Sequence, residues 1–87
     1  YAPLAQVHLV ERGDAPSPEA LFLGLDAPLA GYGHALVFES VEAYARGLYT
    51  ALREADARGL ARVDAQRVAP VGLGRALMDR LTRAAEA

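Results

Sequence analysis

A glycine-rich segment at residues 71–75 (VGLGR) is the part of the sequence best suited to binding a small anion. It lies between an expected strand and an expected helix, where backbone N–H groups and the positive end of the helix can hold a phosphate or a carboxylate. Gly72, Gly74 and Arg75 are therefore the candidate ligand-binding residues. The dinucleotide fingerprint needs a third glycine, and Leu77 stands in its place. The spacing favours the simpler interpretation, in which the two glycines only permit a tight turn and close packing.

Asp56 is the second residue that stands out by its position. It falls within the apolar face of the helix expected over residues 41–58, near the C-terminal end, where the helix dipole disfavours a carboxylate. A carboxylate there needs a partner, and Arg80 lies at the edge of the apolar face of the last expected helix. We hypothesise that Asp56 and Arg80 form a structural ion pair across the two helices. The alternative is that Asp56 is simply solvated at a frayed helix end.

The sequence offers no convincing set of catalytic or metal-binding residues. His8 and His34 are the only imidazoles, and neither has a carboxylate or a second ligand at metal-binding spacing nearby. Ser17, Ser40 and Thr50 lack the strand–turn–helix context of an activated nucleophile. Cysteine is absent, which excludes disulfides and thiolate chemistry. We therefore predict no catalytic residue, no metal site and no cofactor.

The elements that would position these residues indicate an α/β fold. Apolar patterning predicts four strands and two helices. The strands are expected over residues 5–10, 21–25, 35–38 and 61–68, and the helices over residues 41–58 and 74–85. The order β-β-β-α-β-α, with its strand–helix–strand–helix end, implies a right-handed parallel crossover. We expect a small Rossmann-like sheet of about four strands, at least partly parallel.

Two of the expected strands need a further argument. Residues 21–25 (LFLGL) form a typical buried strand, but residues 17–19 (SPE) just before them are also a typical helix start. Gly24 and Pro28 leave room for barely two helical turns, which favours the strand. Residues 61–68 alternate between apolar and polar side chains, so we expect that strand to have a wet face and to lie near a sheet edge.

Each helix presents one apolar face, and these faces supply most of the expected core. Ser40 is the expected N-cap of the first helix, and Gly59 its C′ residue. The first face consists of Val41, Tyr44, Ala45, Leu48, Tyr49, Leu52 and Ala55, and the second of Leu73, Leu77, Met78, Leu81, Ala84 and Ala85. On the polar faces, three pairs have the i,i+4 spacing of surface ion pairs, namely Glu42–Arg46, Glu54–Arg58 and Asp79–Arg83.

Length and composition describe one small domain without a strong charge preference. The chain has 87 residues, of which 53% are hydrophobic, and a net charge of −2. All nine basic residues are arginine, yet the mildly acidic balance does not support a surface that follows a phosphate backbone. No apolar run approaches the roughly 18 residues of a membrane span. We expect a cytoplasmic protein without membrane contact.

Two stretches of the sequence, residues 44–53 (YARGLYTALR) and 72–81 (GLGRALMDRL), belong to a pattern that extends over residues 38–85 and includes Asp56. This pattern resembles the C-terminal domain of long-form L-threonylcarbamoyl-AMP synthases, in the Sua/YciO/YrdC family. Residues 1–3 (YAP) resemble the end of the linker that joins this domain to the catalytic domain. No single motif is catalytic, so the resemblance depends on the whole pattern.

The resemblance implies a role beside an enzyme. Synthases of this family make threonylcarbamoyl-AMP from threonine, bicarbonate and ATP for a tRNA modification, and their chemistry resides in a YrdC-like domain that nothing in this sequence matches. The resemblance thus implies a non-catalytic accessory domain at residues 5–87, preceded by a linker that ends at residues 1–4. Its partner would be a YrdC-like catalytic domain in cis or in trans, and tRNA would be only an indirect partner.

Two features suggest further roles. Longer family members generally carry a helix between the first two strands, where this chain has only residues 11–19. Its loss is expected to leave a sheet face or edge uncovered, which favours packing on a partner or on a second copy as a homodimer. The alternative function is a stand-alone module that binds a small anion or nucleotide at the glycine turn.

Overall fold

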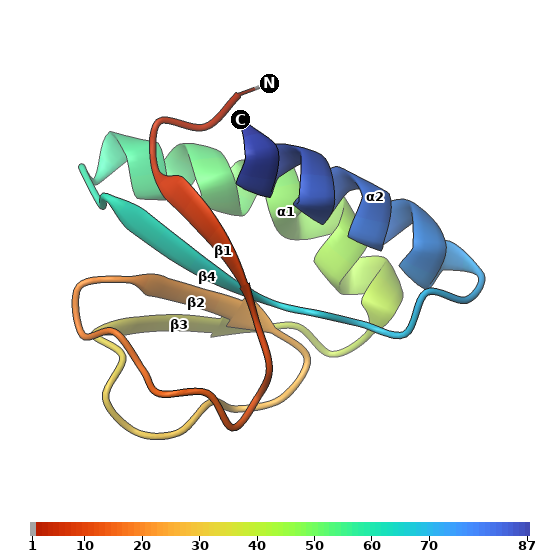
Figure 1. Ribbon diagram of the computed structural model, residues 1–87, viewed down its shortest axis with the longest axis horizontal. Coiled ribbons are helices and arrows are strands. Elements are labelled where there is room, and N and C mark those ends of the chain that lie inside the picture. Colours follow the sequence, from red (N-terminus) through yellow and green to blue (C-terminus); the bar gives the residue numbers. More distant parts are fainter. Residues whose placement is uncertain (1) are drawn as a thin grey trace.

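The computed structural model describes residues 2–87 and shows one parallel sheet with both helices packed against the same face (Figure 1). The strands are β1 (Gln6–Val10), β2 (Leu21–Gly24), β3 (His34–Val37) and β4 (Arg62–Gln66), and the helices are α1 (Val41–Ala57) and α2 (Leu73–Glu86). All strand pairs are parallel, and the order across the sheet is β1-β4-β2-β3. The predicted α/β class, the element order and the strand at residues 21–25 are confirmed.

The last strand enters the sheet in its interior. From β1 the chain passes to β2 and β3, and α1 then carries it back, so that β4 fills the place between β1 and β2. The earlier connections, residues 11–20 and 25–33, contain no helix. They cover the face opposite the helices, which we call the loop face, and they are bonded to each other through Gly33 N and Pro18 O at 3.0 Å. The face packed against α1 and α2 is the helix face.

The expectation that residues 61–68 form a partly wet strand near a sheet edge is wrong. β4 has neighbours on both sides, and four of its five residues are buried. Val63 and Ala65 belong to the core on the helix face, so Asp64 and Gln66 point to the loop face. Buried polar groups are tolerated where they are hydrogen-bonded, and no buried side-chain nitrogen or oxygen in residues 2–87 lacks a partner.

The core on the helix face contains most of the predicted helix positions. Tyr49 and Leu73 differ, because they lie at the edges of their apolar faces and stay 38% and 46% exposed. Ala51, outside the predicted set, is buried. The buried positions are Tyr44, Ala45, Leu48, Ala51, Leu52 and Ala55 in α1, and Gly74, Leu77, Leu81 and Ala84 in α2.

Both ends of α1 form as predicted. Ser40 Oγ accepts a hydrogen bond from Ala43 N at 3.0 Å, and Gly59 adopts a φ of 71° just after the helix. The three predicted i,i+4 ion pairs also form, all between exposed side chains, so each contributes only a few tenths of a kcal/mol. In residues 2–87, neither helix is both long and apolar enough to cross a bilayer.

Gly24, at the end of β2, gives a testable prediction because a side chain does not fit there. A Cβ at this position would lie 2.5 Å from Gln66 Oε1 and 2.7 Å from the Phe22 ring. We expect Gly24→Ala to lower the free energy of unfolding in urea by about 2 kcal/mol, as overpacked cores do. Gly13→Ala is the control, since nothing lies within 4 Å of its Cβ position, and its effect should stay below about 0.5 kcal/mol. Equal stabilities of the two variants would contradict the prediction.

Candidate functional site

A buried polar cluster lies on the loop face, around the middle of β4. Its centre is Asp64, which is 0% exposed. Asp64 Oδ2 accepts a hydrogen bond from the Tyr32 hydroxyl at 2.6 Å, and Asp64 Oδ1 accepts one from Arg62 Nε at 2.7 Å. Both oxygens of the carboxylate thus have short hydrogen bonds, and the bond to Arg62 is also an ion pair.

The electrostatics of this cluster keep Tyr32 and Arg62 protonated. Burial, together with the hydrogen bond to Asp64, raises the pKa of Tyr32 above its ordinary value, so the hydroxyl stays protonated and remains a donor. The hydrogen bond to Asp64 also raises the pKa of Arg62, which keeps the guanidinium charged beside the carboxylate. A general acid or base works best with a pKa near the operating pH, and Tyr32 is moved away from it. The cluster is therefore suited to holding the structure rather than to moving protons.

Two side chains of β4 bond the connection between β2 and β3 to the sheet. Gln66 Oε1 accepts hydrogen bonds from Leu25 N at 2.7 Å and Asp26 N at 3.2 Å, and Gln66 Nε2 donates to Asp26 Oδ2 at 3.0 Å. At the other end of the same connection, Tyr32 is held by Asp64. The connection is thus fixed at both ends, and it covers the loop face in place of a helix.

Sequence reasoning missed this cluster. The alternation Arg62-Val63-Asp64-Ala65-Gln66 is typical of a half-exposed strand, and it led to the wrong expectation of a wet face. One available signal is topological, because a strand that returns after a crossover helix can enter the interior of a parallel sheet, where both faces are covered. The other is Tyr32, a single aromatic residue between Gly31 and Gly33, which needs an apolar partner and finds one in Phe22 at 5.3 Å between ring centroids.

The predicted ligand-binding residues lie at the start of α2. Gly72 is the N-cap residue, with a φ of 56° and no side-chain cap. Gly74 N donates to Val71 O at 2.9 Å and Arg75 N donates to Gly72 O at 3.1 Å, so two of the N–H groups that could hold an anion already have backbone partners. A Cβ on Gly74 would collide with Ala69 O, which makes this glycine necessary for close packing. An anion site at Gly72, Gly74 and Arg75 stays a prediction.

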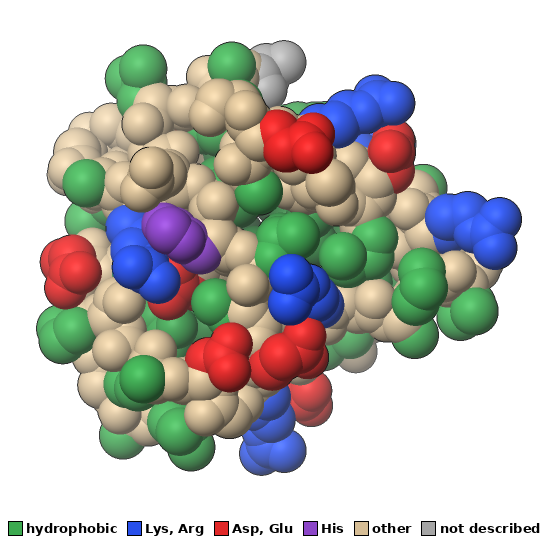
Figure 2. All heavy atoms as spheres, in the orientation of Figure 1, with side chains coloured by type: hydrophobic (Ala, Val, Ile, Leu, Met, Phe, Trp, Pro, Cys, Tyr) green, Lys and Arg blue, Asp and Glu red, His purple; other side chains and the backbone are tan. Residues whose placement is uncertain are grey.

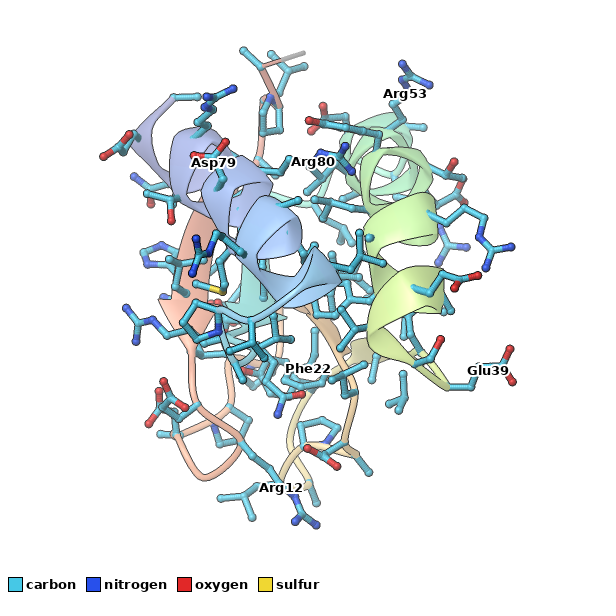
Figure 3. All side chains as sticks on the ribbon, turned by 90° about the vertical axis from the view of Figure 1, so that its right-hand side faces the viewer. Arg12, Phe22, Glu39, Arg53, Asp79 and Arg80 are labelled. Carbon is cyan, nitrogen blue, oxygen red and sulfur yellow. The ribbon has the colours of Figure 1, made fainter. Side chains whose placement is uncertain are left out.

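The two residues of the predicted ion pair have different surroundings. Asp56 accepts hydrogen bonds from Leu4 N and Ala5 N, at 3.1 and 3.0 Å. Arg80 is exposed and extends from α2 toward the side on which α1 lies (Figure 3). An ion pair between Asp56 and Arg80 stays a prediction. The structure thus gives the Asp56 carboxylate two backbone amides as hydrogen-bond partners.

The two histidines lie on the two opposite edge strands of the sheet, His8 in β1 and His34 in β3. His8 is paired in register with Asp64 across β1 and β4, and its Nε2 lies 3.2 Å from Gln6 Oε1. His34 begins β3 and is exposed. Within residues 2–87, no group of three His, Cys, Asp or Glu side chains is placed to hold a metal ion.

β3 is an open edge of the sheet, and a groove lies between it and α1. All four residues of β3 are exposed, including Leu36 at 43% and Val37 at 46%. The groove has a volume of about 750 Å³ and a mostly apolar lining, to which α1 also contributes Glu54 and Arg58. On the face shown in Figure 2, acidic and basic side chains are interspersed rather than separated by sign. The exposed features described so far are thus the apolar edge at β3 and the mixed charges on the face shown in Figure 2.

One comparison with known proteins identifies a relative. A family model described as the C-terminal domain of threonylcarbamoyl-AMP synthase matches residues 1–86. No curated protein and no solved structure matches the chain.

Removing the Tyr32 hydroxyl should loosen the loop face. Tyr32→Phe leaves Asp64 Oδ2 buried without this donor, so we expect the free energy of unfolding to fall by about 1.5–3 kcal/mol, as for hydrogen bonds to charged groups. The same substitution in an Asp64→Asn background should cost at least about 0.5 kcal/mol less, because the two groups interact directly. Urea unfolding of the wild type, the two single variants and the double variant measures this coupling. Additive changes in the free energy of unfolding would contradict it.

Alkaline pH should destabilise the fold through Tyr44 and Tyr32. Burial raises the pKa of Tyr44, which is 0% exposed and donates to Gln66 O at 3.0 Å, and the pKa of Tyr32 is raised as well. Because these pKa values lie above the unfolded value of about 10, the stability they confer is complete below pH 10 and is lost as the pH rises further. For Tyr44 the loss should reach about 1.4 kcal/mol per pH unit. Urea unfolding between pH 8 and 11 tests this, and Tyr44→Phe should show a shallower decline; a flat profile for the wild type would be the contrary result.

Proposed function

The chain belongs to the family of threonylcarbamoyl-AMP synthase C-terminal domains, and from this premise we propose that it is a non-catalytic accessory domain. It acts with a YrdC-like catalytic domain, in cis or in trans, in making threonylcarbamoyl-AMP for tRNA modification. The observation that carries the proposal is the match over residues 1–86 to a model of that C-terminal domain. A cytoplasmic location and an indirect relation to tRNA are parts of the same proposal.

The geometry of the polar groups supports an accessory role. Asp64, the fully buried carboxylate, has both oxygens engaged in hydrogen bonds that hold Tyr32 and Arg62. Asp56 is likewise engaged with the backbone of residues 4 and 5. These carboxylates organise the fold, which leaves them poorly suited to act as general bases. The interspersed charges on the face shown in Figure 2 also fit an indirect relation to tRNA better than direct binding through that face.

An activity assay tests the accessory role. We expect the 87-residue chain alone to form no threonylcarbamoyl-AMP from threonine, bicarbonate and ATP, and we expect removal of residues 5–87 from a protein that joins it to the catalytic domain to lower the rate at least about threefold. Leu81→Asp, in the core, should reproduce the loss, because a buried charge disrupts packing. Thr82→Asp is the matched control at the adjacent exposed position and should keep the activity. An unchanged rate without residues 5–87 would overturn the proposal.

Calorimetry separates this role from that of a stand-alone ligand-binding module. The 87-residue chain should show no saturable binding of ATP or threonine, and it should bind the catalytic domain supplied in trans. Saturable ATP binding that Arg75→Ala abolishes would instead support the module with its site at the start of α2.

A further inference from the structure

Asp56 holds the segment by which the chain enters the domain. Its Oδ2 accepts from Leu4 N at 3.1 Å and its Oδ1 accepts from Ala5 N at 3.0 Å, across 52 and 51 positions of sequence. The next amide, Gln6 N, donates to Ala61 O at 2.8 Å, where the pairing with β4 begins. Three successive amides are therefore fixed, two of them by one carboxylate.

The position of Asp56 carries an electrostatic cost that these bonds offset. It lies near the C-terminal end of α1, where the helix dipole disfavours a carboxylate by about 0.3–1 kcal/mol. Hydrogen bonds to an ionised carboxylate are stronger than those between neutral groups. Two donors on two different oxygens also fix the orientation of the bound peptide as well as its position. The side-chain hydrogen bonds of Asp56 to Leu4 N and Ala5 N thus stabilise a distant segment rather than the end of its own helix.

The bound residues form the boundary between the core and exposed chain. Ala5 is 4% exposed and belongs to the core, whereas Leu4 is 90% exposed. Pro3, just before them, has a fixed φ and restricts Ala2 to extended backbone, which narrows the conformations open to these two residues. Residues 2–5 and the C-terminal end of α2 lie at the same end of the molecule (Figure 1). A chain that precedes Leu4 would thus leave the domain in one direction.

We propose that Asp56 is a positioning residue, whose carboxylate latches residues 4 and 5 to α1 and so sets the direction in which the preceding segment leaves the domain. The latch itself is independent of the proposed function, and its consequence for a preceding catalytic domain rests on that function. Without the latch, the segment pivots at Gln6, the first residue held by the sheet, and a preceding domain samples a wider range of orientations.

Hydrogen exchange in the 87-residue chain tests the latch. We expect the amides of Leu4 and Ala5 to exchange at least about tenfold faster in Asp56→Ala than in the wild type, with Asp56→Asn in between, while the β4 amides keep their protection. Glu54→Ala is the matched control, because this acid lies on the same helix but is exposed and paired with Arg58. If Leu4 and Ala5 exchange at random-coil rates in the wild type itself, the latch does not exist, whether or not the variants fold.

A distance measurement tests the consequence for a joined catalytic domain. The chain has no cysteine, so Thr82→Cys at an exposed position of α2 gives a single label site, and a second label on the catalytic domain completes the pair. We expect Asp56→Ala to broaden the distance distribution between the labels, and Glu54→Ala to leave it unchanged. An unchanged distribution beside faster exchange of Leu4 and Ala5 would overturn the positioning role. Failure of the accessory function would appear separately, as an activity that does not depend on residues 5–87.

Discussion

A carboxylate that is removed from water must be paired with a charged or hydrogen-bonding group. In this molecule that requirement determines how the loop face of the sheet, which has no helix on it, is covered. Leaving Asp64 buried without partners would cost several kcal/mol, whereas the bonds from Tyr32 and Arg62 satisfy both of its oxygens. Tyr32 belongs to a helix-free connection, which therefore has to lie on the sheet. Gln66 fixes the start of the same connection, so polar bonding replaces the apolar packing that a second helix layer would give.

The parts of the fold that follow from local pattern could be predicted, and those set by strand order could not. Ser40, Gly59 and the apolar face of α1 are local features, and each has its expected place. The burial of Asp64 is different, because it depends on β4 lying between β1 and β2, and an alternating strand looks the same at an edge. For Asp56, one part could be predicted and the other could not. The helix dipole indicates that the carboxylate needs a partner, but no sequence pattern identifies backbone amides more than fifty residues away as that partner.

Asp56 and Asp64 both accept hydrogen bonds that hold separate segments of the chain together. Each carboxylate accepts from two donors and joins segments that are far apart in the chain, one at the entry to the domain and one between the sheet and a loop. Two acids engaged in this way specify an arrangement of the backbone rather than a reaction.

The interior position of β4 also determines the order in which the domain can assemble as it is synthesised. β1 is an edge strand whose neighbour in the sheet is β4, so residues 6–10 find their partner only after residues 62–66 have emerged from the ribosome. β2 and β3 can pair much earlier, since one short connection joins them. Non-local parallel pairing is slow, and unpaired strands are prone to aggregation. Until residues 62–66 have been synthesised, then, Val7 and Val10 of the nascent chain lack the strand with which they pair.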